Sequence, residues 1–270
     1  MIHRSLLRAL LVVSLVPVLG IRAYAALGDA GGSHRWGVVI NGDTEERHRM
    51  NADLVYEFMQ GYYHIPPDHI YFLSTRPGKG GIQGDGVGQN VMLAARQLAE
   101  TLTADDELVV YTTGHGGREE SVGGFIALAD GIVKAGDFAH AFLANKAGKT
   151  VYFGDQCDSG SLAKSMIETD KRVMALSSVD DKHSTVCNFF IVPYLDAFKD
   201  PANDVDPKDG IVTEWEAFSS AKRQSLESHR RMIDEMRRHN QSSDETAEEM
   251  SSGMYLLSPA WSKDGRGAGK

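Results

Sequence analysis

Short runs of apolar residues alternate along this chain with longer segments in which apolar positions recur every three or four residues. The short runs are rich in Val, Ile, Leu, Phe and Tyr, which is typical of strands buried on both faces of a sheet. They predict strands at Trp36–Ile40, His69–Ser74, Leu108–Thr113, Val151–Phe153, Arg172–Ser177 and Met254–Leu257. The amphipathic segments predict helices at Met50–Gln60, Val91–Leu102, Gly136–Asn145, Ser161–Glu168, Asn188–Phe198 and Trp215–His239.

This alternation of strands and helices predicts an α/β fold with a parallel sheet and right-handed crossovers. No repeat or linker divides the chain, so we expect residues 26–270 to form a single domain. Gly123–Val133 is expected to form a hairpin, and the glycine-rich stretch Pro77–Gly88 a mobile surface loop.

Three finer expectations concern the segments before and within the first two helices. A polar loop is expected to carry Arg47 and His48 ahead of the first helix. Met50 and Leu54 belong to the helical repeat that follows, and Leu93 is expected to face inward from the next helix.

The N-terminus resembles a secretory signal. His3, Arg4 and Arg8 precede an apolar run of about thirteen residues, Ala9–Ile21, and Ala23–Ala25 supplies a small-x-small cleavage site. An uncleaved anchor is the alternative, although spanning a bilayer takes roughly twenty apolar residues. We therefore expect the first 25 residues to be a signal peptide and the mature protein to work in the periplasm or to be secreted.

Composition excludes some functions. The chain is 42% hydrophobic and 24% charged, and its net charge is −9. An acidic protein has no general basic field for nucleic acid, and we expect neither nucleic-acid binding nor membrane association after signal removal. The sequence carries no signal for an oligomeric state.

Two predicted strands end in chemically reactive residues. Leu108–Thr113 leads into His115 between glycines, and Val151–Phe153 leads through Gly154 into Cys157. Open α/β sheets keep their ligand sites at the carboxyl ends of strands, so the pair suggests a nucleophile and its proton-transfer partner. The alternatives are a small buried cysteine and a histidine at an ordinary turn.

The second cysteine, Cys187, raises the alternative of a disulfide with Cys157. A domain of this size can be stable without disulfides, so we favour a free Cys157 and a Cys187 that packs as a small apolar residue.

We expect no metal and no cofactor. The acidic stretch Asp209–Glu216 imitates half of an EF-hand loop, but Val205 and Pro207 would occupy its first and third positions, so an acidic turn with a helix N-cap is the alternative that we favour. No histidine pair or cysteine pair has zinc-site spacing, and no Gly-Lys-Ser/Thr follows the glycine-rich stretch.

The stretches His115-Gly116 and Asp155-Gln156-Cys157-Asp158-Ser159-Gly160, each after a hydrophobic strand, resemble the legumain family of cysteine endopeptidases. Arg47-His48 and Ala175-Leu176-Ser177-Ser178 fit the same family. The resemblance covers roughly residues 36–198 and implies a caspase-like fold, a three-layer sandwich with a mostly parallel central sheet.

The resemblance also implies roles for individual residues. Cys157 would attack the scissile carbonyl to form a thioester, His115 would act as general acid and base, and the amides of Cys157 and Gly116 would bind the oxyanion. The S1 pocket would be lined by Arg47, His48, Asp155 and Ser177, with Arg47 and Asp155 gripping the side-chain amide of a P1 Asn, or accepting Asp at lower pH.

Some alternatives remain open. Arg47 and Asp155 could instead form a solvated ion pair at a loop. Asp155 is one methylene shorter than the glutamate of the family. The rival functions are a transamidase or non-peptide amide hydrolase on the same scaffold, and a non-catalytic binding module.

Overall fold

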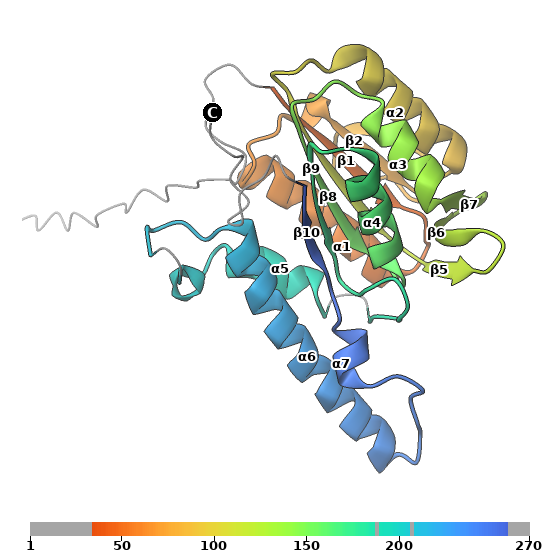
Figure 1. Ribbon diagram of the computed structural model, residues 1–270, viewed down its shortest axis with the longest axis vertical. Helices are drawn as coiled ribbons and strands as arrows, with labels where there is room; N and C mark the ends of the chain where they lie inside the picture. The colour runs from red at the N-terminus through yellow and green to blue at the C-terminus, as the bar shows by residue number, and fades with distance from the viewer. Residues whose placement is uncertain (1–33, 187–188, 206–207, 259–270) are drawn as a thin grey trace, which may run out of the picture.

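The described part of the computed structural model comprises residues 34–186, 189–205 and 208–258. Within it, a seven-stranded sheet lies at the centre of the protein (Figure 1). Its strands, in spatial order, are β10 (Tyr255–Leu257), β9 (Val173–Ser177), β8 (Lys149–Asp155), β4 (Glu107–Thr113), β1 (Arg35–Asn41), β2 (Ile70–Ser74) and β3 (Ile82–Gly84). All neighbouring pairs are parallel except β9 and β10. The predicted α/β class and mostly parallel sheet are confirmed.

Helices cover both faces of this sheet (Figure 1). One face packs against α1 (Glu46–Gly61), α5 (Ile191–Ala197) and α6 (Glu214–Arg238), and the other against α2 (Gly88–Thr101), α3 (Ala135–Leu143) and α4 (Ser159–Thr169). Side chains of successive strand residues point to opposite faces, so Val39 and Val109 belong to the first core and Val38 and Val110 to the second. The result is the expected three-layer sandwich.

A second, three-stranded sheet follows β4 directly. It consists of β5 (Gly116–Glu119), β6 (Gly123–Leu128) and β7 (Gly131–Lys134), paired antiparallel in that order. The hairpin predicted at Gly123–Val133 is therefore confirmed. Strand β5 was not expected from the sequence; it pairs Gly116 with Ile126 of β6 immediately after His115.

The C-terminal half of α6 and the short helix α7 (Ala247–Met250) form an arm that projects beyond the sheet (Figure 1). At the start of α6, Thr213 caps the helix: its hydroxyl accepts from the Glu216 amide, and the Glu216 carboxylate accepts from the Thr213 amide. Glu216 is the last position of the EF-hand-like stretch. Its carboxylate takes part in the N-cap of α6, which is the alternative that the sequence favoured over a calcium ligand. Two 3₁₀ turns, Pro67–His69 and Pro201–Asn203, complete the described elements.

Several local expectations were wrong. Arg47 and His48 lie in the first turn of α1 rather than in a loop before it. The inner face of α1 carries His48, Ala52, Val55 and Met59, and Met50, about 200° around the helix from His48, is exposed. Leu54 on α1 and Leu93 on α2 are exposed for the same geometric reason.

Two segment boundaries also differ from the expectation. Pro77–Gly88 is not wholly a loop, because Ile82–Gly84 pairs with β2 as the edge strand β3. The helix expected at Asn188–Phe198 begins only at Ile191.

Two sequence expectations fall outside the described residues: the signal peptide and the packing of Cys187. Among the helices that are described, none combines the length and the apolar character needed to cross a bilayer.

Candidate active site

The predicted site residues converge where the connectivity of the sheet reverses. The chain leaves β1 towards β2 on one side, and the later strands β4 and β8 lie on the other side of β1. Asn41, Thr113 and Asp155 are aligned across these three parallel strands. The loops that follow carry Asp43, His115 and Cys157, so all three start from one edge of the sheet, where open α/β folds bind ligands.

His115 faces two carboxylates. Its Nε2 lies 3.0 Å from Asp43 Oδ2 and 3.6 Å from Glu45 Oε1, while 55% of its side chain remains exposed. The chain reaches this position through Gly114, whose φ of 128° an L side chain would rarely adopt. The second carboxylate oxygen of Asp43 accepts from the Glu45 amide at 2.5 Å, so the Asp43 side chain is itself held in place. A carboxylate on Nε2 fixes the orientation of the imidazole and the nitrogen that carries the proton.

The buried His48 packs against the ring of His115. Its Nδ1 is 3.1 Å from the Thr113 hydroxyl, and its ring stands edge-on to that of His115 with 5.6 Å between centroids. The side chain is buried, and burial, reinforced by the charge of Arg47, lowers the pKa of His48 to about 4. His48 is therefore a neutral imidazole at neutral pH.

Cys157 carries a free, half-buried thiol. Its Sγ lies 3.8 Å from the Thr185 carbonyl oxygen, and no described residue accepts a hydrogen bond from its backbone amide. Cys157 is therefore a free thiol, as the sequence favoured.

Gly116 packs directly against the Cys157 backbone. A Cβ on Gly116 would lie 2.4 Å from the Cys157 carbonyl oxygen and 2.6 Å from Gln156 Cγ, closer than real contacts allow. Ala127 N–H donates to His115 O, and Gly116 is paired with Ile126, which is the non-hydrogen-bonded position of an antiparallel ladder. The Gly116 N–H is therefore directed away from β6 and is not used by the sheet.

A covering segment, residues 180–186, contacts Cys157 and its neighbour Asp158. Besides the Thr185 contact, the His183 carbonyl accepts from the Asp158 amide at 3.1 Å. The α6–α7 region holds this covering segment: Glu245 accepts from the Ser184 amide at 3.0 and 3.1 Å, and His229 Nε2 accepts from the Val186 amide at 3.3 Å.

Asp155 is fully buried at the end of β8. Its Oδ2 accepts from Asn51 Nδ2 at 3.0 Å and from the Tyr111 hydroxyl at 3.3 Å. Burial raises the pKa of Asp155 to about 7, and the hydrogen bonds from Tyr111, Asn51 and Ser178 only partly oppose that rise.

The remaining predicted pocket residues, Arg47 and Ser177, pair with groups other than Asp155. Arg47 is exposed and pairs with Glu45, with 2.6 Å between Nε and Oε2. Because Asp155 is fully buried, the solvated Arg47–Asp155 ion pair that was one alternative does not form. Ser177 is also fully buried, and its hydroxyl accepts from the Met254 amide at 3.2 Å, so Ser178 is the serine beside Asp155.

Several residues that support this site were not expected from the sequence. Asp43 follows the carboxyl end of β1, so the rule that drew attention to His115 and Cys157 applies to it as well. Glu45, Asn51 and Tyr111 gave no signal, because their partners are distant in sequence and packing decides which face of a helix or strand is used. Ser178 belonged to the family-like stretch, but the pocket role was given to Ser177.

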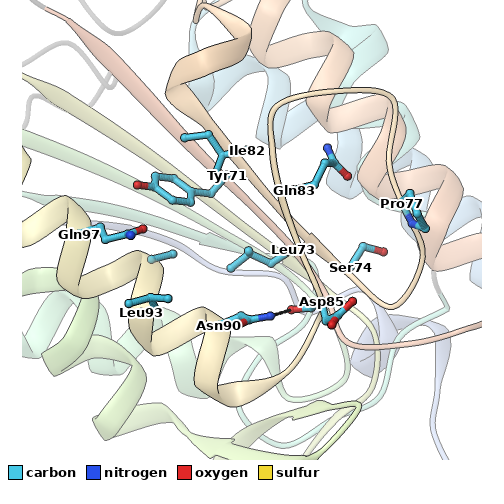
Figure 2. Close-up of a pocket in the computed structure, with 12 residues that line it drawn as sticks. Tyr71, Leu73, Ser74, Pro77, Ile82, Gln83, Asp85, Asn90, Leu93 and Gln97 are labelled. Atoms are coloured by element: carbon cyan, nitrogen blue, oxygen red, sulfur yellow. Dashed lines mark hydrogen bonds between the residues drawn. The ribbon is translucent and has the colours of Figure 1, made fainter.

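A separate cavity lies near the β3 edge of the sheet. Figure 2 shows it between β2, β3 and α2, with Tyr71, Ile82 and Leu93 along its wall. None of the seven predicted site residues lines it. This cavity and the exposure of Leu93 belong to a different part of the molecule from the cluster around Cys157.

Comparison with known proteins gives a family and a fold. The model of the Peptidase C13 family matches residues 85–247, which contain His115 and Cys157. No curated protein sequence matches the chain. Caspase-1 from Spodoptera frugiperda has a similar structure, with a TM-score of 0.51 and 9% identity over 84% of this chain and 87% of that one. Protein GSU0716 from Geobacter sulfurreducens has a TM-score of 0.43 and 13% identity over 62% of this chain and 82% of that one.

Proposed function

Because the chain belongs to the Peptidase C13 family and has a caspase-like fold, we propose that it is a cysteine endopeptidase with Cys157 as nucleophile and His115 as general acid and base. The observation that carries the proposal is the alignment of Thr113 with Asp155 on adjacent strands. Because these two residues are neighbours, the loops that carry His115 and Cys157 leave the sheet edge side by side. Gly116 then packs against the Cys157 backbone.

In the proposed reaction, the Cys157 thiolate attacks the carbonyl carbon of the scissile bond. The carbon–nitrogen bond breaks, His115 gives a proton to the leaving amine, and a thioester remains on Cys157. His115 then takes a proton from water, whose oxygen attacks the thioester and releases the acid product. Asp43 keeps the His115 ring oriented through its contact with Nε2.

The oxyanion of both tetrahedral intermediates needs backbone donors. The Cys157 amide has no acceptor among the described residues, and the Gly116 amide is not used by β6. Gly116 packs against the Cys157 backbone, so the two amides belong to residues in direct contact, which supports their assignment as the oxyanion hole.

We further propose that P1 Asn is preferred, with Arg47 and His48 at the rim of the pocket and Asp155 and Ser177 beneath it. Arg47 is exposed beside the buried His48, whereas Asp155 and Ser177 are covered. A direct contact between Asp155 and a P1 amide therefore requires the residues above it to move when substrate binds. The apolar leader within residues 1–25 supports a site of action outside the cytoplasm.

A fluorogenic peptide series that varies only P1 tests this function. We expect cleavage after Asn, weaker cleavage after Asp, and no turnover by Cys157→Ala. Stoichiometric alkylation of Cys157 in the native enzyme should abolish activity in proportion to labelling. Cleavage after Arg or Lys would refute the P1 assignment, and activity retained by Cys157→Ala would refute the nucleophile.

Gly116→Ala is expected to lower kcat by a factor of about 10²–10³, the usual effect of losing one oxyanion donor. The new methyl group would clash with the Cys157 carbonyl, which is backbone and cannot turn aside. Gly136→Ala is the matched control, because a Cβ there meets nothing within 4 Å. Steady-state kinetics of both variants measures the effect, and thermal unfolding confirms that both are folded. Equal kcat values for the two variants would show that Gly116 does not contribute to the active site.

A further inference from the structure

Asp43, His48 and His115 each offer a ligand atom, and these atoms all lie within 4.8 Å of one another. The three side chains come from the loop after β1, the first turn of α1 and the loop after β4. Their positions are 43, 48 and 115, so no short sequence motif connects them. Two imidazoles and one carboxylate are a ligand set that suits zinc, whereas magnesium and calcium prefer oxygen ligands alone.

The ligand atoms are oriented by neighbours that would form an outer shell. The Thr113 hydroxyl lies 3.1 Å from His48 Nδ1 and fixes that ring. The Glu45 amide holds Asp43 Oδ1, which directs Oδ2 towards His115 at 3.0 Å. Such outer-shell hydrogen bonds are a regular feature of zinc sites, because they hold the ligands in position before the ion arrives.

The site is also accessible and suitably charged. The His115 side chain is 55% exposed, so an ion can reach its ring from solvent, while the buried His48 lies against that ring. Asp43 supplies one negative charge, and the Glu45 carboxylate lies 3.6 Å from His115 Nε2. A three-residue site with solvent in the fourth position is a common zinc arrangement.

We propose that a zinc-class divalent ion binds Asp43, His48 and His115 and reversibly inhibits the enzyme. A His115 ring with one nitrogen bound to a metal cannot become the doubly protonated imidazolium that gives a proton to the leaving amine, and the ion also takes Asp43 from the ring. Binding involves no redox step and no covalent change. The binding part of this inference is independent of the proposed peptidase function; only its inhibitory consequence rests on that function.

Zinc binding is measured on the Cys157→Ala protein, so that no active-site thiol competes for the ion. Titration against a chromophoric zinc chelator is expected to show one ion per chain, and thermal unfolding a zinc-dependent rise in Tm. Mg²⁺ should have neither effect. Adding Asp43→Asn, or separately His115→Ala, should weaken zinc binding at least about 10-fold, since even outer-shell changes cost 10–100-fold.

His183→Ala is the discriminating control. His183 Nδ1 lies 2.8 Å from Asp180 and its Nε2 lies 3.7 Å from Glu249, so it is a second histidine with carboxylate neighbours. Its replacement should leave zinc binding unchanged. Zinc binding lost in His183→Ala and kept in Asp43→Asn would overturn the site, as would no zinc binding at all.

Activity then tests the consequence. In the otherwise unmodified enzyme, zinc should inhibit with the same midpoint as in the binding titration, and EDTA should restore the rate. Zinc that binds at this site and leaves turnover unchanged, or raises it, would overturn the inhibitory role. If no peptide in the P1 series is cleaved while zinc still binds, the proposed peptidase function fails and the metal site stands.

Discussion

Replacing His115 by alanine is expected to lower kcat by a factor of about 10²–10⁴, the usual contribution of a positioned general acid and base. The side chain is 55% exposed and contacts only Asp43, Glu45 and the edge of the His48 ring among the described residues, so few packing contacts are lost. The free energy of unfolding should change by about 0.5 kcal/mol or less. Steady-state kinetics beside thermal unfolding separates the loss of chemistry from a loss of fold.

Two further measurements sharpen that test. His140→Ala is the matched control, because His140 is an exposed histidine on α3 whose Nδ1 lies 2.7 Å from the Gly136 carbonyl oxygen. It should retain full activity. Imidazole added to the buffer should partly restore turnover to His115→Ala and have no effect on His140→Ala. Full activity of His115→Ala would show that another group transfers the proton.

Asp155→Asn is expected to remove a large pH dependence from the stability of the protein. Burial raises the pKa of Asp155 from 3.8 to about 7 in the folded state. A carboxyl group whose pKa is higher in the folded than in the unfolded protein stabilises the folded state fully below pH 3.8. This stabilisation is lost as the pH rises through the folded pKa of about 7. Between pH 5 and pH 8.5, wild type should lose roughly 2–3 kcal/mol relative to Asp155→Asn.

Urea unfolding at a series of pH values measures this difference. Asparagine keeps the shape of the side chain and an oxygen that can accept from Asn51 and Tyr111, so the variant should fold. Asp196→Asn is the control, since Asp196 is exposed and pairs with Lys199 at 2.7 Å. If the free energies of unfolding of wild type and Asp155→Asn changed equally with pH, Asp155 would be ionised throughout the range.

The sheet and the strand-end residues were predictable because their signals are local. Buried parallel strands such as Leu108–Thr113 are continuous apolar runs, and the residues after them lie at one edge of the sheet whatever the details of packing. His115 and Cys157 could therefore be placed near each other from the sequence. The position of the covering segment could not be predicted in this way, because it is decided by the distant partners Glu245 and His229.

The pocket residues show where local signals fail. Arg47 and His48 are consecutive, yet the helix turns them by about 100°, so that His48 is buried and Arg47 is exposed. Periodicity alone did not show where α1 begins. Asp155 ends β8, a strand that is buried from Thr150 onwards, but its hydrogen-bond partners Asn51 and Tyr111 belong to other elements.

The anchors of the covering segment have a consequence for the order in which the chain is assembled during synthesis. Every strand of the central sheet except β10 precedes residue 178, and so do His115 and Cys157. The covering segment, in contrast, is bonded to residues much later in the chain: Ser184 to Glu245, 61 positions on, and Asp180 to Ser252, 72 positions on. Contacts between residues so far apart form late, because the intervening chain must first be ordered. A ribosome-bound chain that has already formed its reactive edge therefore still lacks the supports that hold this cover over the thiol.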